Sequence, residues 1–265
     1  MKRPLLLLAL MITPMTASGQ TIAKGVLLED LTWIEAEKVL TAETVVVIPL
    51  GAASKEHGPH LKLKNDWLIA EYLKREVMAR ANVVIAPTVN YHYYPAFLEY
   101  PGSTALRLET ARDLIVDICR SLARHGPRRF YVLNTGVSTV RALKPAAEIL
   151  AADGILLRYT DLLAILAPIE KAVAKQQGGT HADEIETSMM LYLAPTTVDM
   201  AKAADDYHPG QGPLTRNPTG AGVYSATGIF GNATLASREK GEQITKALLE
   251  GILAEIESVR GAGPP

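Results

Sequence analysis

Residues 51–66, with the sequence GAASKEHGPHLKLKND, concentrate the side-chain types that bind metal ions. The acids and imidazoles of this segment are Glu56, His57, His60 and Asp66, and Lys55 precedes the first of them. Carboxylate oxygens and imidazole nitrogens together form the ligand mixture that binds zinc, manganese or iron. The alternative on these residues alone is a polar loop in which Asp66 only caps the helix that follows.

The segment THADEIETS is a second cluster of acids with a histidine. Thr180 predicts a helix N-cap, with Asp183 as its capping-box-like partner. A helix that starts there places His181 and Glu184 on one face and turns Glu186 away from Glu184. The alternative is that these acids only complement the positive end of the helix dipole.

Apolar strands alternate with helical patterns through the first two thirds of the chain. The predicted strands are 44–50, 82–89, 128–136 and 155–163, and the predicted helices include 66–81 and 108–126. This alternation predicts an α/β fold with a mostly parallel sheet that helices cover on both faces. In such a sheet the ligand site lies beyond the carboxyl ends of the strands. Both the 51–66 segment and NTGVST, residues 134–139, follow strands in this way.

The N-terminal sequence MKRPLLLLALMITPMTASGQ has a basic start, an apolar stretch and small residues, which predicts a secretory signal at residues 1–19. We therefore expect an exported protein, periplasmic or secreted, without stable membrane insertion; the alternative is a retained N-terminal anchor. Residues 25–260 are predicted to form one domain, with an ordered excursion at 201–233. The formal net charge of −1 and the scattered aromatic residues give no indication of a nucleic-acid partner.

Several motifs together resemble the creatininase (creatinine amidohydrolase) family. IPLGAASKEHGPHLKLKND resembles the family's Pro-x-Gly strand end, its Glu-x-His-Gly-Pro-His-Leu segment and a downstream Asp. HADEIETSMML resembles its His-Ala-Gly-Glu-x-Glu-Thr-Ser helix start, and YPGSTALRLETARDL and GIFGNATLASREKG resemble two further segments. The resemblance covers essentially all of residues 25–260.

The resemblance implies a three-layer α/β sandwich, often assembled as a hexamer, that binds one or two divalent metal ions. It also implies hydrolysis of an amide or cyclic amide C–N bond in a small-molecule substrate. By the same resemblance, His57 and Asp66 match metal-ligand positions, and His181 matches the histidine assigned to proton transfer.

Three positions depart from the family pattern. Lys55 stands where the family has its first ligand, a Glu, and Glu56 follows it by one residue. A β-bulge would return Glu56 to the metal. Gly136 replaces the histidine ligand of the family's Asn-Gly-His-Gly-Gly-Asn loop. Phe97 replaces a further histidine, although His92 lies nearby.

The residues that remain to hold a metal are Glu56, His57, Asp66 and Glu184. They predict one divalent ion per subunit, zinc, manganese or iron, with an open position for water. Lys55 has two interpretations. It is an ion-paired neighbour of Glu56, or its ammonium replaces the charge of a metal and stabilises an oxyanion or a substrate carboxylate.

The sequence therefore favours a metal-dependent amidohydrolase, for which creatinine itself is a doubtful substrate because the 134–139 loop is altered. Glu184 or Glu56 would accept a proton from the attacking water, and His181 would protonate the leaving nitrogen. The candidates to bind polar atoms of the substrate are Asn134, Ser138 and His60. The alternative is a catalytically degenerate protein of the same fold that binds a small ligand or a partner in the former cleft.

Overall fold

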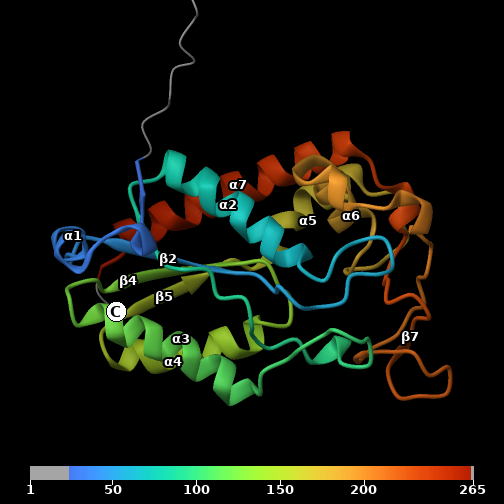
Figure 1. Ribbon diagram of the computed structural model, residues 1–265, viewed down its shortest axis with the longest axis horizontal. Helices are drawn as coiled ribbons and strands as arrows, with labels where there is room; N and C mark the ends of the chain where they lie inside the picture. The colour runs from blue at the N-terminus through green and yellow to red at the C-terminus, as the bar shows by residue number, and fades with distance from the viewer. Residues whose placement is uncertain (1–23, 264–265) are drawn as a thin grey trace, which may run out of the picture.

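A central sheet of five parallel strands organises the computed structural model, which describes residues 24–263 (Figure 1). In spatial order the strands are β1 (Val26–Leu27), β3 (Val84–Ile85), β2 (Val45–Leu50), β4 (Arg129–Asn134) and β5 (Leu156–Tyr159). The central pair, β2 and β4, runs in register from Val45 with Arg129 to Leu50 with Asn134. All residues of β2 are buried, as expected for a strand that is covered on both faces.

Helices cover both faces of this sheet and give the fold three layers. One layer contains α2 (Asn65–Arg80), α5 (Leu162–Val173), α6 (Glu184–Leu193) and α7 (Arg238–Gly261), and the other contains α3 (Leu108–Ala123) and α4 (Val140–Ala152) (Figure 1). The short α1 (Trp33–Val39) packs against the second layer. Successive residues of β2 pack alternately into the two layers: Val47 contacts the first, and Val46 and Ile48 contact the second. The predicted three-layer α/β sandwich with a mostly parallel sheet is confirmed.

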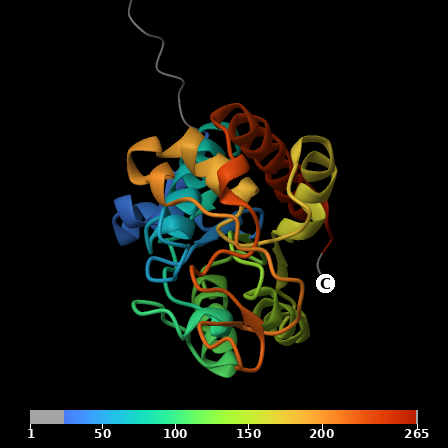
Figure 2. The same ribbon diagram turned by 90° about the vertical axis from the view of Figure 1, so that its right-hand side faces the viewer.

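The excursion of residues 201–233 lies beyond the carboxyl ends of the strands. It contains the paired short strands β6 (Leu214–Thr215) and β7 (Val223–Tyr224). Figure 2 looks onto this end of the molecule and shows the excursion, in orange, in front of the sheet. Leu214 and Val223 pack with the aromatic side chains of Tyr94, Phe97 and Tyr100, so the excursion shares a small apolar core with the segment 94–100.

Some predicted boundaries differ from the structure. The strand expected at 82–89 is reduced to Val84–Ile85, because Pro87 has no N–H to donate to a ladder. The strand expected at 155–163 divides into β5 and the start of α5, where Asp161 caps the helix by accepting the Ala164 N–H.

The predicted signal at residues 1–19 lies outside the described residues and remains a prediction. Among residues 24–263, no helix is both long enough and apolar enough to cross a membrane.

Candidate active site

The loop after β2 folds back against the first turn of α2. Gly51 permits this approach, because a Cβ atom at that position would overlap the carbonyl oxygen of Asp66. Further along, the Lys55 N–H donates to the Leu63 carbonyl at 3.0 Å. The loop therefore brings the acids and histidines of residues 51–66 to the start of α2.

Asp66 is the centre of a buried ion-pair cluster in this loop. Its Oδ2 lies 2.7 Å from the ammonium of Lys55, and its Oδ1 lies 2.7 Å from Nε2 of His57. None of the three side chains is more than 5% exposed. Burial alone would raise the pKa of Asp66, but Lys55 and His57 outweigh burial and hold that pKa well below its usual range.

Two contacts fix the ring of His57. Nδ1 lies 2.9 Å from the Lys55 carbonyl oxygen, which can only accept, so Nδ1 carries a hydrogen. In the neutral ring Nε2 then directs its lone pair at the Asp66 carboxylate, an arrangement that a proton or a metal cation stabilises. Metal-binding histidines usually donate their second nitrogen to a carbonyl or carboxylate in this way.

His181 reaches the same cluster from the segment before α6. Its ring centroid lies 5.0 Å from that of His57. Nε2 lies 3.0 Å from the Glu56 carbonyl oxygen, so this nitrogen carries a hydrogen, while Nδ1 lies 3.5 Å from Oε2 of Glu186. Burial alone would lower the pKa of His181, but the charges of Glu56 and Glu186 raise it above its usual value.

Glu56 is the partner of His181 in this arrangement. Its Oε2 lies 3.1 Å from Nε2 of His181, and its Oε1 accepts the N–H of Gly58. Burial alone would raise the pKa of Glu56, but His181 and the Gly58 hydrogen bond lower it. Glu56, which the sequence predicts as a metal ligand, thus accepts a hydrogen bond from Nε2 of His181.

The helix that carries the second cluster begins at Glu184, so the N-cap predicted at Thr180 is wrong. Asp183 is the N-cap and accepts two N–H groups of the first turn. The residues before it are held out of the helix by Phe230, whose carbonyl oxygen accepts the Thr180 N–H at 3.0 Å. Ala182 adopts a positive φ of 48°, which a helix does not allow.

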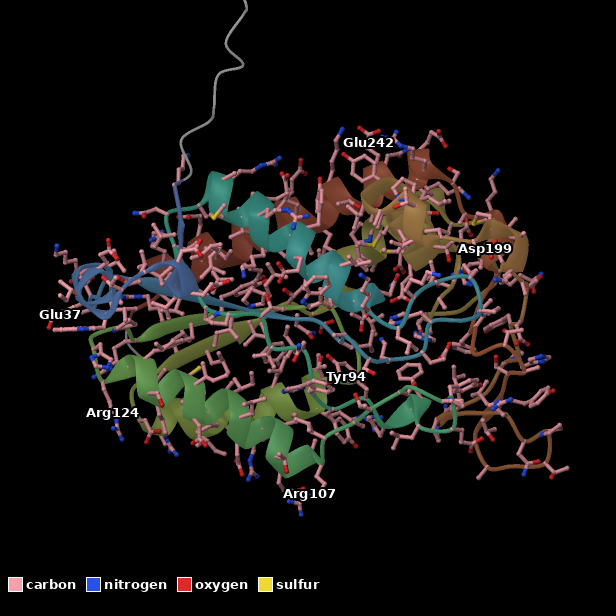
Figure 3. The ribbon with its side chains drawn as sticks, viewed as in Figure 1. Glu37, Tyr94, Arg107, Arg124, Asp199 and Glu242 are labelled. Carbon is pink, nitrogen blue, oxygen red and sulfur yellow. The ribbon has the colours of Figure 1, made fainter. Side chains whose placement is uncertain are left out.

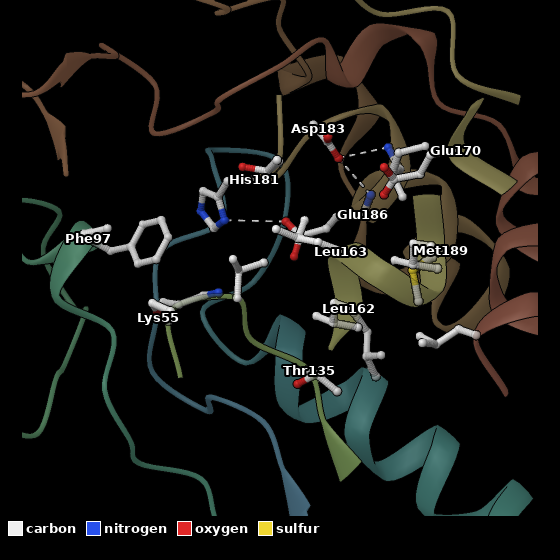
Figure 4. Close-up of a pocket in the computed structure, with 18 of the residues that line it drawn as sticks. Lys55, Phe97, Thr135, Leu162, Leu163, Glu170, His181, Asp183, Glu186 and Met189 are labelled. Carbon is white, nitrogen blue, oxygen red and sulfur yellow. Dashed lines mark hydrogen bonds and ion pairs between the residues drawn. The ribbon is translucent and has the colours of Figure 1, made fainter. Parts of the chain in front are cut away.

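This later start changes which acid points at the cluster. Glu184, predicted as a ligand and base, is fully buried and turned away from the cluster. Its carboxylate forms an ion pair with Lys240 and accepts hydrogen bonds from two backbone N–H groups, at 2.8 and 2.7 Å. Glu186 is the acid that faces His181 (Figure 4). The sequence did contain the signal, because Asp183 and Glu186 have the spacing of a capping box.

Three side chains are arranged to hold a metal ion. One ring nitrogen of His57, one of His181 and one carboxylate oxygen of Glu186 lie within 4.8 Å of one another. The hydrogens on His57 Nδ1 and His181 Nε2 leave the other nitrogen of each ring, in its neutral form, to coordinate a metal. That nitrogen of His57 already lies 2.7 Å from Oδ1 of Asp66, and that of His181 lies 3.5 Å from Oε2 of Glu186. Two imidazoles, one carboxylate and an open position form a ligand set of catalytic zinc sites, so these residues fit one divalent ion. Asp66 and Glu56, predicted as ligands, lie around this group as partners of its histidines.

Asn134 and Ser138, the predicted substrate-binding residues after β4, lie in different surroundings. The Asn134 amide donates to the carbonyls of Gly136 and Thr160, at 2.7 and 3.1 Å, and is fully buried. It shapes the turn after β4. Ser138 lines the pocket described below, although its hydroxyl donates to the Tyr93 carbonyl at 3.0 Å.

The remaining predicted positions surround the cluster at different depths. His60 places Nε2 2.8 Å from the Thr187 hydroxyl, and burial lowers its pKa to about 4. Phe97 stacks on His181, with ring centroids 4.2 Å apart. His92 is fully buried and donates to a backbone carbonyl of α3, so it does not replace the histidine that Phe97 displaced.

A pocket of about 310 Å³ opens beside the cluster, beyond the ends of β2 and β4 (Figure 4). Lys55, Phe97 and His181 line it on the side of the cluster. Its apolar wall includes Ile69, Val137, Leu162, Leu163, Leu166 and Met189. This is the position that the α/β topology predicts for a ligand site.

Comparison with known proteins assigns the chain to a family. The model of the creatininase family, described as creatinine amidohydrolase, matches residues 29–256. The chain belongs to the creatininase family. It is 30% identical to the creatinine amidohydrolase of Pseudomonas putida, over 92% of this chain and 100% of that protein. It is 28% identical to the mycofactocin precursor peptide peptidase of Mycobacterium tuberculosis, over 80% of this chain and 84% of that one.

A solved structure described as creatininase Mn has a TM-score of 0.73 and 28% identity, over 90% of this chain and 100% of that chain. Gly136, the position at which the family pattern leads us to expect a histidine, lies in tight surroundings. A Cβ atom there would lie 3.0 Å from a methyl group of Thr139 and 3.1 Å from the ring of Tyr94, so a side chain at this position would require these neighbours to shift slightly.

Proposed function

We propose that this member of the creatininase family is a hydrolase that cleaves an amide or cyclic amide C–N bond at His57, His181 and Glu186. The observation that carries the proposal is the convergence of these three side chains, from two distant segments, beside a pocket. The family description and the Pseudomonas relative, both named for the hydrolysis of creatinine, support the class of bond.

The proposed cofactor is one divalent ion, and the manganese form of a similar creatininase supports manganese, with zinc and iron as alternatives. When bound, the ion would supply Lewis acidity and lower the pKa of water at the site, so that hydroxide is available to attack an amide near neutral pH. The Glu56 carboxylate and the Lys55 carbonyl orient the two histidine rings. Because the charges around His181 outweigh the effect of burial and raise its pKa, a proton on that ring would compete with a metal ion for the ring nitrogen.

The pocket favours an amide that carries an apolar group. Val137 and Leu163 are 43% and 47% exposed, although both line the pocket, so they offer apolar surface to a substrate. The ammonium of Lys55, at the same pocket, can stabilise negative charge that develops on the carbonyl oxygen. We propose an N-acyl or peptide-like amide with an aliphatic side chain in preference to a compact polar ring such as creatinine.

A pair of isosteric variants tests this function. Glu186→Gln is expected to lower both the metal content of the purified protein and its hydrolysis of the best substrate in an amide panel by at least about a hundredfold. Glu184→Gln is the matched control and is expected to keep its metal. Elemental analysis and product detection give the two readouts. Unchanged metal and turnover in Glu186→Gln would refute the site, and a protein without metal after metal-replete growth would favour the ligand-binding alternative.

We also propose that the protein is exported and assembles as a homo-oligomer, a hexamer by family resemblance. The pattern of residues 1–19 supports export. N-terminal sequencing of the mature protein and light scattering during size-exclusion chromatography test the two proposals. An intact N-terminus in the cytoplasm, or a monomeric mass, would contradict them.

A further inference from the structure

Lys55 is buried, which is rare for a lysine side chain. It is 4% exposed, and its ammonium lies 4.9 Å from the ring centroid of Phe97 and 5.5 Å from that of Tyr94. Figure 3 shows Tyr94 inside the molecule, while Arg107 and Asp199 lie at its periphery. A buried ammonium without a partner costs several kcal/mol in a folded protein. Its place here therefore depends on the negative charges around it.

The closest of those charges is the Asp66 carboxylate, whose Oδ2 lies 2.7 Å from the Lys55 ammonium. The backbone of Lys55 is also held on both sides, by its N–H to the Leu63 carbonyl and by its carbonyl to Nδ1 of His57. The ammonium is thus a positive charge that the fold fixes beside the proposed metal ligands.

The position of this charge is the one that a further cation would need. Asp66 contacts Lys55 through Oδ2 and His57 through Oδ1, so both of its oxygens are already engaged. A second divalent ion bound by Asp66 would meet the Lys55 ammonium at short range, where like charges repel strongly in a buried site.

A charge balance leads to the same result. The carboxylates in contact with His57, His181 or Lys55 belong to Glu56, Asp66 and Glu186, and Lys55 offsets one of their three negative charges. The nearby Asp183 instead accepts hydrogen bonds from Gln176 and from two backbone N–H groups of α6. Glu184 does not enter the balance because Lys240 neutralises it. One divalent ion therefore brings the group to neutrality, and a second would leave two uncompensated positive charges.

We infer that Lys55 takes the place of a second divalent cation, so that the centre binds one metal ion and keeps the ammonium as its other positive charge. This inference rests on the proposed single-metal centre and adds the physical reason for its stoichiometry. It also assigns a reason for the lysine, whose ion pair with Asp66 substitutes for a metal–carboxylate contact.

The test is a titration of the full-length protein with Mn²⁺, with bound metal counted and its electron paramagnetic resonance spectrum recorded. We expect one Mn²⁺ per chain and a mononuclear six-line spectrum. Lys55→Glu converts the positive charge to a negative one and is expected to bind two ions, with the spectrum of an exchange-coupled pair. Lys74→Met is the control, because Lys74 is equally buried but pairs with Glu29 away from the cluster; it is expected to bind one ion.

A second variant covers the case in which Lys55→Glu does not fold. Lys55→Met removes the charge, releases Oδ2 of Asp66 and should tighten the binding of the first Mn²⁺ by about tenfold or more. Two ions in the unaltered protein would overturn the inference while leaving the hydrolase intact. So would a folded Lys55→Glu that still binds one ion, or an unchanged affinity in Lys55→Met. An unaltered protein that binds no Mn²⁺ would instead remove the proposed metal centre itself.

Discussion

Glu184 and Glu186 show how two positions along one helix give two acids different surroundings. Both lie in the first turn of α6, and helical geometry turns them in different directions. Lys240 and two backbone N–H groups already compensate the charge of Glu184. Among the described residues, Glu186 has a single hydrogen-bond donor, the Ala182 N–H, and faces His181. Its charge therefore remains open to a cation.

His92 is a residue whose burial should make the protein acid-sensitive. Its Nε2 donates to the Ala111 carbonyl at 3.0 Å, and burial lowers its pKa to about 4. An unfolded histidine titrates near about pH 6.5. Between these two values the unfolded chain takes up a proton that the folded chain does not. The stabilising contribution is complete above the unfolded pKa, and we expect up to about 3 kcal/mol to be lost as the pH falls to about 4.

His92→Gln measures this contribution, because glutamine keeps an amide donor for Ala111 and does not titrate. Urea unfolding at pH 7 and at pH 4.5 gives the free energy of unfolding of both proteins. The variant should lose less stability than the unaltered protein over this interval. Equal losses would show that His92 is not the group responsible.

At the scale of elements, α6 shows where local sequence signals stop being sufficient. The sequence correctly predicts a helix here. It does not predict the helix start, because the decisive interaction is the pairing of His181 with Phe230, whose N–H donates to the His181 carbonyl at 2.9 Å. A contact between residues so distant in sequence leaves no local pattern. Thr180 with Asp183 and Asp183 with Glu186 have the same capping-box spacing, so the sequence alone does not decide which pair starts the helix.

The packing of α7 on α6 gives an element-scale prediction. A Cβ atom on Gly241 would overlap the carbonyl oxygen of Ser188, so the two helices approach each other at this glycine. Gly241→Ala must separate them and should lower the free energy of unfolding by about 1–3 kcal/mol. Gly261→Ala, at the end of α7 with no atom within 4 Å of the added methyl, is the control and should be neutral or slightly stabilising. Thermal unfolding compares the two, and equal midpoints would contradict this account.

At the scale of the whole molecule, the strand order decides which loops meet. β2 and β4 are neighbours, so the loops that follow them open at one end of the sheet (Figure 1). The sequence predicts this much, because parallel strands place their ligand loops at a common edge. The position of α6 beside these loops depends on long-range contacts, such as the ion pair of Glu184 with Lys240 in α7. Only the folded chain reveals them.

Because the candidate ligands come from distant segments, a bound metal ion should stabilise the folded state of the whole chain. His57 belongs to the loop after β2 and His181 with Glu186 to the start of α6, so an unfolded chain cannot bring the three ligands together. An ion that binds only the folded state stabilises it by about 2.7 kcal/mol at a hundred times its Kd. For a chain of this size that corresponds to roughly 5–10 °C in the midpoint of thermal unfolding.

We therefore expect a chelator to lower the midpoint of thermal unfolding of the metal-loaded protein, and added Mn²⁺ to restore it. Differential scanning calorimetry with and without chelator measures the shift. Glu186→Gln lacks one ligand, so the chelator should not change its midpoint of thermal unfolding. Glu184→Gln should respond to the chelator like the unaltered protein, even if its midpoint starts lower. A chelator effect that persists in Glu186→Gln would place the stabilising ion elsewhere, because this carboxylate is the acid that α6 offers to the two histidines.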